Sequence, residues 1–103
     1  MKSITVSELQ QLLESNEDIQ LIDVRESWEH QAFHIGGILV PLGTLIENME
    51  KVSKNKVVVF YCQKGIRSQI AIQRLQLKSG FENLFNLSGG MDAWKAAGLP
   101  SAG

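Results

Sequence analysis

The feature that most constrains the fold is KVVVFY at residues 56–61, an almost unbroken run of β-branched and aromatic residues. A strand with one face in water alternates apolar and polar side chains, whereas this run places apolar side chains on both faces. Such a strand is typical of the centre of a parallel sheet that helices cover on both sides. The run therefore predicts an α/β fold with residues 56–61 as a central strand.

The rest of the chain alternates between short strand-like and helix-like segments. Further strands are expected at 4–6, 19–24, 38–40 and 84–87, and helices or helical turns at 7–15, 25–32, 44–52, 66–78 and 91–97. Ser7 and Gln10 match a capping box at the start of the first helix, and Gly80 suits the left-handed position after residues 66–78. This alternation predicts an open, mostly parallel sheet of four or five strands with helices on both faces.

The length and composition agree with a single domain spanning residues 1–103. Chains below roughly 150 residues rarely divide into two domains, and 44% hydrophobic residues are enough for one core. The residues expected in that core are Leu9, Leu12, Leu13, Leu21, Ile22, Val57, Val58, Val59, Phe60, Ile70, Ala71, Leu75, Leu84 and Trp94.

Charge and hydropathy exclude several classes of function. The net charge is −1, so we expect no nucleic-acid partner. The longest apolar run, residues 57–61, is too short to span a bilayer, and the first residues lack the apolar segment of a secretory signal. The sequence therefore predicts a cytoplasmic protein with no membrane partner.

The only cysteine, Cys62, directly follows the predicted central strand. One cysteine cannot form an internal disulfide, so its role rests either on thiol chemistry or on packing as a small buried side chain. In open α/β sheets, ligands bind beyond the carboxyl ends of the strands. Asp23 and Arg25 lie at the end of another predicted strand, so we expect them at the same edge of the sheet. They are interpreted either as supporting residues of a site or as a structural ion pair.

The hexad that begins at Cys62 has features that favour the reactive thiolate form. The cysteine lies just before a predicted helix, whose first N–H groups and dipole stabilise negative charge. Lys64 and Arg67 add two positive charges, and Gly65 lets the backbone N–H groups turn inward as an anion-binding nest. The predicted catalytic residue is Cys62, and the predicted substrate-binding residues are Gln63, Lys64, Gly65, Ile66, Arg67 and Ser68.

Three segments resemble the rhodanese-like sulfurtransferase family. YCQKGIRS at residues 61–68 resembles the active-site loop of the family. LIDVRESWEHQAFHIGG at residues 21–37 resembles its Asp-Val-Arg-Glu…His-Ile-x-Gly segment, and NLSGGMDAW at residues 86–94 resembles its closing Gly-Gly-x-x-Ala-Trp segment. The three matches occur in the family's order and cover almost the whole chain.

The resemblance implies a mechanism. Cys62 would take the outer sulfur of a donor such as thiosulfate, become a persulfide, and pass the sulfur to cyanide or to a thiol such as glutathione or thioredoxin. The loop N–H groups would stabilise the persulfide, and Arg67 would attract the sulfonate of the donor. The lysine at Lys64 resembles that of family members that use thiosulfate. No metal or organic cofactor is implied.

Two alternatives remain beside this interpretation. The domain could be a persulfide carrier or a regulatory module that does not turn over. Cysteine phosphatases, including relatives on the same fold, also use a cysteine–arginine loop, but with five residues between the two. Here four residues separate Cys62 from Arg67, and we expect no aspartate near the loop to act as a general acid.

Other polar and aromatic residues have more ordinary interpretations. Glu26 and Glu29 are predicted to lie on a solvated helix face. The spacing of His30 and His34 would suit a metal on one helix face, but no third ligand is apparent, and the resemblance favours a hydrogen-bonded structural role for His34. Trp94 is predicted to lie in the core. Trp28 is left open, either as a packing residue or as part of an acceptor groove.

Overall fold

The computed structural model describes residues 1–102 and contains one five-stranded sheet in the order β1-β5-β4-β2-β3. Every neighbouring pair of strands is parallel. The strands are β1 (Ser3–Ile4), β2 (Ile19–Asp23), β3 (Ile38–Leu39), β4 (Val57–Tyr61) and β5 (Leu84–Leu87). The helices are α1 (Val6–Glu14), α2 (Ser27–Ala32), α3 (Ile66–Ser79) and α4 (Gly90–Ala96), with 3-10 helices at Leu42–Thr44 and Ile46–Lys51. The predicted α/β fold with a parallel sheet is confirmed.

The apolar run that predicted a central strand forms β4, which pairs with β2 on one side and β5 on the other. Its side chains alternate between the two faces of the sheet. Val58 and Phe60 pack with Ile72 and other residues of the α3 side, whereas Val59 and Tyr61 pack on the α1 and α4 side. The core therefore consists of two layers, one above and one below the sheet.

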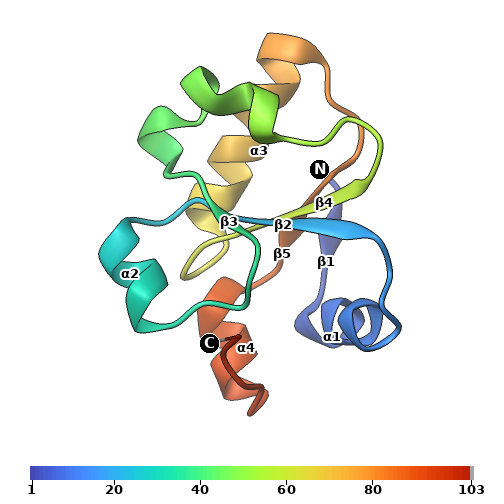
Figure 1. Ribbon diagram of the computed structural model, residues 1–103, viewed down its shortest axis with the longest axis vertical. Coiled ribbons are helices and arrows are strands. Elements are labelled where there is room, and N and C mark those ends of the chain that lie inside the picture. The colour runs from blue at the N-terminus through green and yellow to red at the C-terminus, as the bar shows by residue number, and fades with distance from the viewer. Residues whose placement is uncertain (103) are drawn as a thin grey trace.

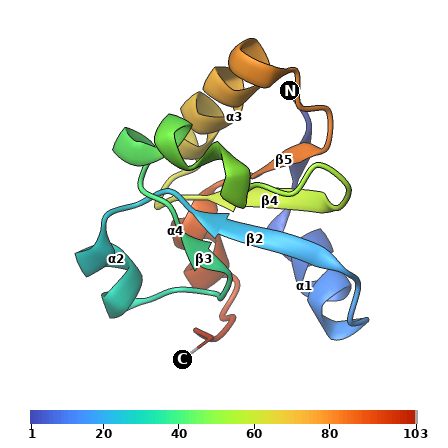
Figure 2. The ribbon, with the colours of Figure 1, turned by 45° about the horizontal axis from the view of Figure 1, so that its top comes forward.

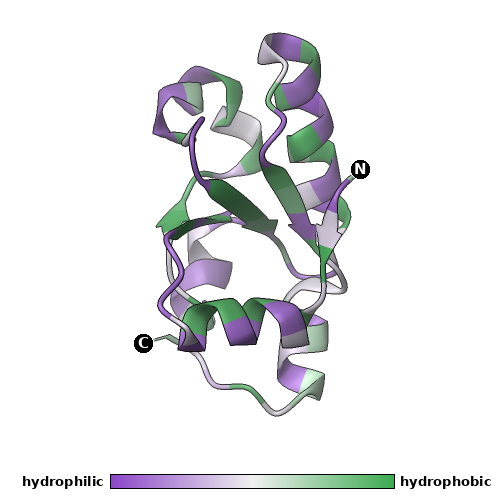
Figure 3. Cartoon of the chain, turned by 90° about the vertical axis from the view of Figure 1, so that its right-hand side faces the viewer, coloured by the Kyte–Doolittle hydropathy of each residue, from purple (hydrophilic) through white to green (hydrophobic). Residues whose placement is uncertain are grey.

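The ribbon views show which helices cover each face. α3 and the two 3-10 helices lie on one side of the sheet, α1 and α4 lie on the other, and α2 stands beside the end of β2 (Figures 1 and 2). Apolar residues dominate the strands, while the helices alternate apolar and polar segments (Figure 3). The carboxyl ends of β2 and β4 therefore open toward α2 and the start of α3.

The predicted cap of the first helix needs correction. The first helix is capped by Thr5, two residues before Ser7: the Glu8 N–H donates to Thr5 Oγ1 at 3.1 Å, and the Thr5 N–H donates to Glu8 Oε1 at 2.9 Å. This reciprocal bonding satisfies two orphan donors, and it also lowers the pKa of Glu8. Gly80 has the predicted left-handed conformation, with φ +64°.

The predicted core is largely confirmed, with Trp94 buried and Leu84 fully enclosed. The prediction that Val57 lies in the core is wrong, because this first residue of β4 is 37% exposed. Leu12, Leu13 and Ile70 are only partly buried. Across residues 1–102, no helix combines the length and apolarity that a membrane crossing requires.

Candidate active site

The candidate site lies where β4 ends and α3 begins. Cys62 follows β4 directly, and α3 starts four residues later at Ile66. Asp23 pairs in register with Tyr61 on the neighbouring strand, so the ends of β2 and β4 share one edge. The structure therefore brings Asp23 and Arg25 to the edge that holds the cysteine, as the alternation of strands and helices predicts.

Two backbone N–H groups of the loop are directed at the sulfur. The Gly65 N–H donates to Cys62 Sγ at 3.1 Å, and the Ser68 N–H donates to it at 3.4 Å. Gly65 has φ +86°, a conformation that side chains disfavour, and this turn aims its N–H inward. The other loop N–H groups make no hydrogen bond to the sulfur, so the nest is smaller than the sequence predicts. The inward pair still provides positive dipoles beside the sulfur.

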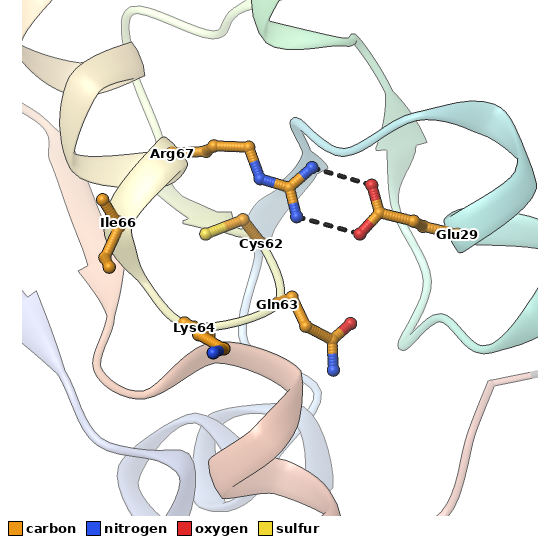
Figure 4. A pocket seen from close by; sticks show the side chains of 6 residues that line it. All are labelled: Glu29, Cys62, Gln63, Lys64, Ile66 and Arg67. Carbon is orange, nitrogen blue, oxygen red and sulfur yellow. Dashed lines mark hydrogen bonds and ion pairs between the residues drawn. The ribbon is translucent and has the colours of Figure 1, made fainter.

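The sulfur lies at the base of a small pocket. Cys62 is only 1% exposed, yet it lines an opening of about 260 Å³ together with Glu29, Gln63, Lys64, Ile66 and Arg67 (Figure 4). Ile66 is well exposed at the mouth, and the Gln63 side chain turns away from the sulfur. A nucleophile in this position can meet a small reactant that enters from above while the protein covers its other sides.

Sequence reasoning missed Asn86, which supports the loop from β5. The Ser68 hydroxyl donates to Asn86 Oδ1, and Asn86 Nδ2 donates to the Gly65 carbonyl at 3.3 Å. Ser68 Oγ also lies 3.4 Å from Cys62 Sγ, in a contact in which either atom can donate. Asn86 is 2% exposed and is the one polar residue of the apolar strand LFNL, which is the signal that could have identified it.

The start of α4 also supports the loop. The Met91 and Asp92 N–H groups donate to the carbonyls of Cys62 and Gln63 at 2.9 and 3.0 Å. A Cβ atom at Gly90 would overlap the Cys62 carbonyl oxygen, so only glycine permits this approach. In the sequence, Gly89 and Gly90 predict a turn. The close contact between Gly90 and the Cys62 carbonyl could not be predicted, because it depends on how α4 packs against the loop.

Arg67 is already paired with an internal carboxylate. Its Nη1 and Nη2 donate to Glu29 Oε1 and Oε2 at 2.7 and 2.8 Å, in the two-pronged geometry shown in Figure 4. The prediction that Glu29 lies on a solvated helix face is therefore wrong: its side chain is 10% exposed and lines the pocket. The hydrogen bonds from Arg67 lower the pKa of Glu29 to about 2, and those same bonds raise the pKa of Arg67.

Arg25 does not face the pocket as a free charge. It is 1% exposed, and its Nε and Nη2 donate to the Asp23 carboxylate at 2.9 Å, while Nη2 also donates to the Phe33 carbonyl. Nη1 donates to Gln63 Oε1 at 3.0 Å. This geometry fits the structural ion pair, and Arg25 also contacts the loop through Gln63.

Gln63 links this ion pair to α4. Its Nε2 donates to Asp92 Oδ1 at 2.6 Å. α4 thus brings Asp92 beside the loop, where the sequence predicts no aspartate that acts as a general acid. The Asp92 carboxylate contacts the outward-turned amide, however, and it makes no hydrogen bond to Cys62.

The two histidines have structural contacts. His30 Nδ1 lies 2.9 Å from Asp23 Oδ2, and His34 Nδ1 accepts a hydrogen bond from the Gly36 N–H at 3.1 Å. Their rings stack with centroids 4.1 Å apart. Within residues 1–102, no group of three or more His, Cys, Asp or Glu side chains is arranged to hold a metal ion.

Several known proteins resemble the chain in sequence and in structure. Over 106 residues it is 36% identical to the putative sulfurtransferase YtwF of Bacillus subtilis, covering 97% of this chain and 96% of that protein. It is 39% identical over 80 residues to the thiosulfate sulfurtransferase GlpE of Coxiella burnetii, covering 77% of this chain and 74% of the relative. The crystal structure of a rhodanese-like domain protein from Staphylococcus aureus superposes with a TM-score of 0.83 at 34% identity, with 91% of each chain covered.

Two other relatives are longer proteins. The chain is 30% identical over 92 residues to the putative sulfur carrier protein YrkF of Bacillus subtilis, covering 88% of this chain but 49% of YrkF. An uncharacterised Synechocystis protein is 39% identical over 100 residues, and the match covers 96% of this chain and 55% of the relative. Residues 5–97 match the family model for the rhodanese-like domain. The chain therefore belongs to the rhodanese-like domain family.

Proposed function

We propose that the protein is a sulfurtransferase that carries a sulfane sulfur on Cys62, with thiosulfate or a similar anion as the donor. The observation that carries this proposal is the environment of the sulfur. Cys62 Sγ lies at the base of a pocket and accepts hydrogen bonds from two loop N–H groups. Those groups favour a negative charge on or just above the sulfur, in the thiolate and in the persulfide.

The reaction takes two displacements at sulfur. The Cys62 thiolate attacks the outer sulfur of thiosulfate, an S–S bond forms at Sγ, and sulfite leaves with the electron pair of the bond that breaks. A thiolate or cyanide then attacks the outer sulfur of the persulfide, and Cys62 leaves as a thiolate. Such a cycle has a covalent intermediate and predicts ping-pong kinetics.

The positive groups around the pocket suit an anionic donor. Arg67 gives two N–H groups to Glu29 and keeps three others, since a guanidinium has five. Lys64 lines the same pocket and is exposed. We propose that these two side chains attract the sulfonate, while Gly65 and Ser68 hold the transferred sulfur.

A second candidate is a persulfide carrier that hands sulfur to a partner without rapid turnover. The name of the relative YrkF, a putative sulfur carrier protein, favours this candidate. Both candidates need the same Cys62 persulfide, so they differ in the second step alone. We propose a thiol acceptor for either one, with glutathione and thioredoxin as the first acceptors to test.

The test measures persulfide formation and turnover separately. Purified protein is incubated with thiosulfate, and its mass is compared with that of Cys62→Ser, which we expect to gain no sulfur. Addition of cyanide should release thiocyanate from the unmodified protein and only background amounts from Cys62→Ser. A mass gain of one sulfur without turnover would favour the carrier. No gain with thiosulfate or with an organic persulfide would contradict both candidates.

A further inference from the structure

A second depression lies beside the sulfur pocket. It has a volume of about 280 Å³, and Trp28, Phe33 and Lys95 form its outer wall. Glu29 and Gln63 line both this depression and the sulfur pocket, so the two openings share a wall. A molecule seated in the depression is therefore next to the position that the outer sulfur of a persulfide would occupy.

The depression offers an apolar surface. Trp28 is 70% exposed at the start of α2, although tryptophan side chains are mostly buried in folded proteins. Phe33, at the end of α2, is partly buried below it. Aromatic side chains of this kind supply contact area at little cost in conformational entropy.

Lys95 brings an ammonium group without an ion-pair partner to the depression. Its ammonium lies 4.5 Å from the centroid of the Phe33 ring, and it makes no ion pair with any carboxylate of residues 1–102. Two of the other charged groups nearby already have charged partners: Arg25 pairs with Asp23, and Glu29 pairs with Arg67. The Asp92 carboxylate accepts a hydrogen bond from the neutral Gln63 amide and keeps its negative charge.

We propose that this depression is the acceptor site and that it binds a small thiol that carries a carboxylate. The carboxylate contacts Lys95, the body of the thiol lies against Trp28 and Phe33, and its sulfur reaches past Glu29 and Gln63. The acceptor thiolate then attacks the outer sulfur of the persulfide, a new S–S bond forms as the bond to Sγ breaks, and Cys62 leaves as a thiolate. This inference rests on the proposed function and adds the place where the acceptor binds and the carboxylate that it carries.

The first experiment follows the second half-reaction. Protein is loaded with thiosulfate, freed of donor, and mixed with glutathione, with uncharged 2-mercaptoethanol or with cyanide. An exposed charge pair contributes up to about 1 kcal/mol, which is about fivefold in binding. For Lys95→Gln we expect the glutathione concentration at half-maximal rate to rise about two- to fivefold, and more for Lys95→Glu. Loading, and transfer to 2-mercaptoethanol and cyanide, should not change.

Matched variants make the result specific. Lys78→Gln removes an exposed lysine near the end of α3 and should transfer sulfur to glutathione like the unmodified protein. Trp28→Ala should slow transfer to glutathione while leaving persulfide loading intact. If Lys95→Gln and Lys95→Glu use glutathione as well as the unmodified protein does, the acceptor site is wrong.

A second experiment measures ligand binding in the depression directly, without any sulfur transfer. In a titration with S-methylglutathione, the indole N–H signal of Trp28 should shift with saturation, and that of buried Trp94 should stay in place. Lys95→Gln should weaken this shift. A failure to form the persulfide in the unmodified protein would count against the proposed function, whereas an unmoved Trp28 signal would overturn the acceptor site itself.

Discussion

Two arginine–carboxylate ion pairs lie at the same edge of the sheet. They differ in burial and in the number of other groups that the arginine contacts. Arg25 and Asp23 are both almost fully buried, and the guanidinium also donates to Gln63 and to the Phe33 carbonyl. Arg67 is 36% exposed and donates to Glu29 on one side only. The first pair belongs to the framework, while the second faces the pocket with donors to spare.

The difference shows how position decides what an ion pair does. A buried charge without its partner is costly, so the Asp23–Arg25 pair must stay intact for the fold to persist. A half-exposed charge can exchange one anionic partner for another at small cost, because water compensates. Arg67 can therefore serve an incoming anion, whereas Arg25 cannot.

The largest expected effect comes from breaking the framework pair. Asp23→Asn leaves the Arg25 guanidinium buried beside a neutral amide and weakens the contact with His30 as well. We expect a loss of about 3–5 kcal/mol in the free energy of unfolding, the usual cost of an uncompensated buried charge. Urea denaturation followed by circular dichroism measures it.

The control for this variant is Asp18→Asn, which removes the exposed pair between Asp18 and Lys56. Exposed pairs contribute about 0–1 kcal/mol, so this variant should unfold at nearly the same urea concentration as the unmodified protein. If Asp23→Asn and Asp18→Asn lost the same free energy of unfolding, the Asp23–Arg25 pair would not be a buried part of the framework.

A smaller effect on stability, and a larger one on chemistry, is expected from Arg67→Ala. Hydrogen bonds to charged groups contribute about 1.5–3 kcal/mol, so kcat/KM for thiosulfate should fall roughly 10- to 100-fold. Part of this fall comes from the unpaired Glu29 carboxylate, which repels the donor. The double variant Glu29→Gln/Arg67→Ala should recover that part. Unchanged kinetics with thiosulfate in Arg67→Ala would remove Arg67 from the donor site.

The smallest effect is the pH dependence of the pocket pair. The pKa of Glu29 is lowered from 4.5 to about 2 by its hydrogen bonds with Arg67. A lowered pKa in the folded protein means that the pair stabilises the fold fully above pH 4.5 and loses this contribution as the pH falls toward about 2. Urea denaturation of the unmodified protein and of Glu29→Gln should therefore converge over that range. A difference that stays constant with pH would contradict the assignment.

The strands and the location of the cysteine could be predicted because they depend on local pattern. The apolar run of β4 identifies a central strand, and the parallel topology then places Cys62 and Asp23 at one edge. Those inferences need only the chain order and the handedness of the connections. The cap at Thr5 was missed because Ser7 also fits a capping box in sequence.

The walls of the site could not be predicted in the same way. Glu29 and Arg67 are 38 residues apart in the chain, and their contact depends on how α2 and α3 sit on the sheet. The local sequence predicts that Glu29 is exposed to solvent, because it does not show that Arg67 of another helix contacts this side chain. The role of Asn86 could not be predicted either, because its hydrogen bonds to Ser68 and Gly65 depend on where β5 lies relative to the loop.

The contact of α4 with the loop has a consequence for how the protein is made. Residues 62–68 leave the ribosome before Met91 and Asp92, whose N–H groups donate to the carbonyls of Cys62 and Gln63. A growing chain therefore carries the Cys62 loop before the helix that supports it has emerged. Until α4 docks, these two carbonyls lack their donors, so the loop reaches its final shape only when nearly the whole chain has been made.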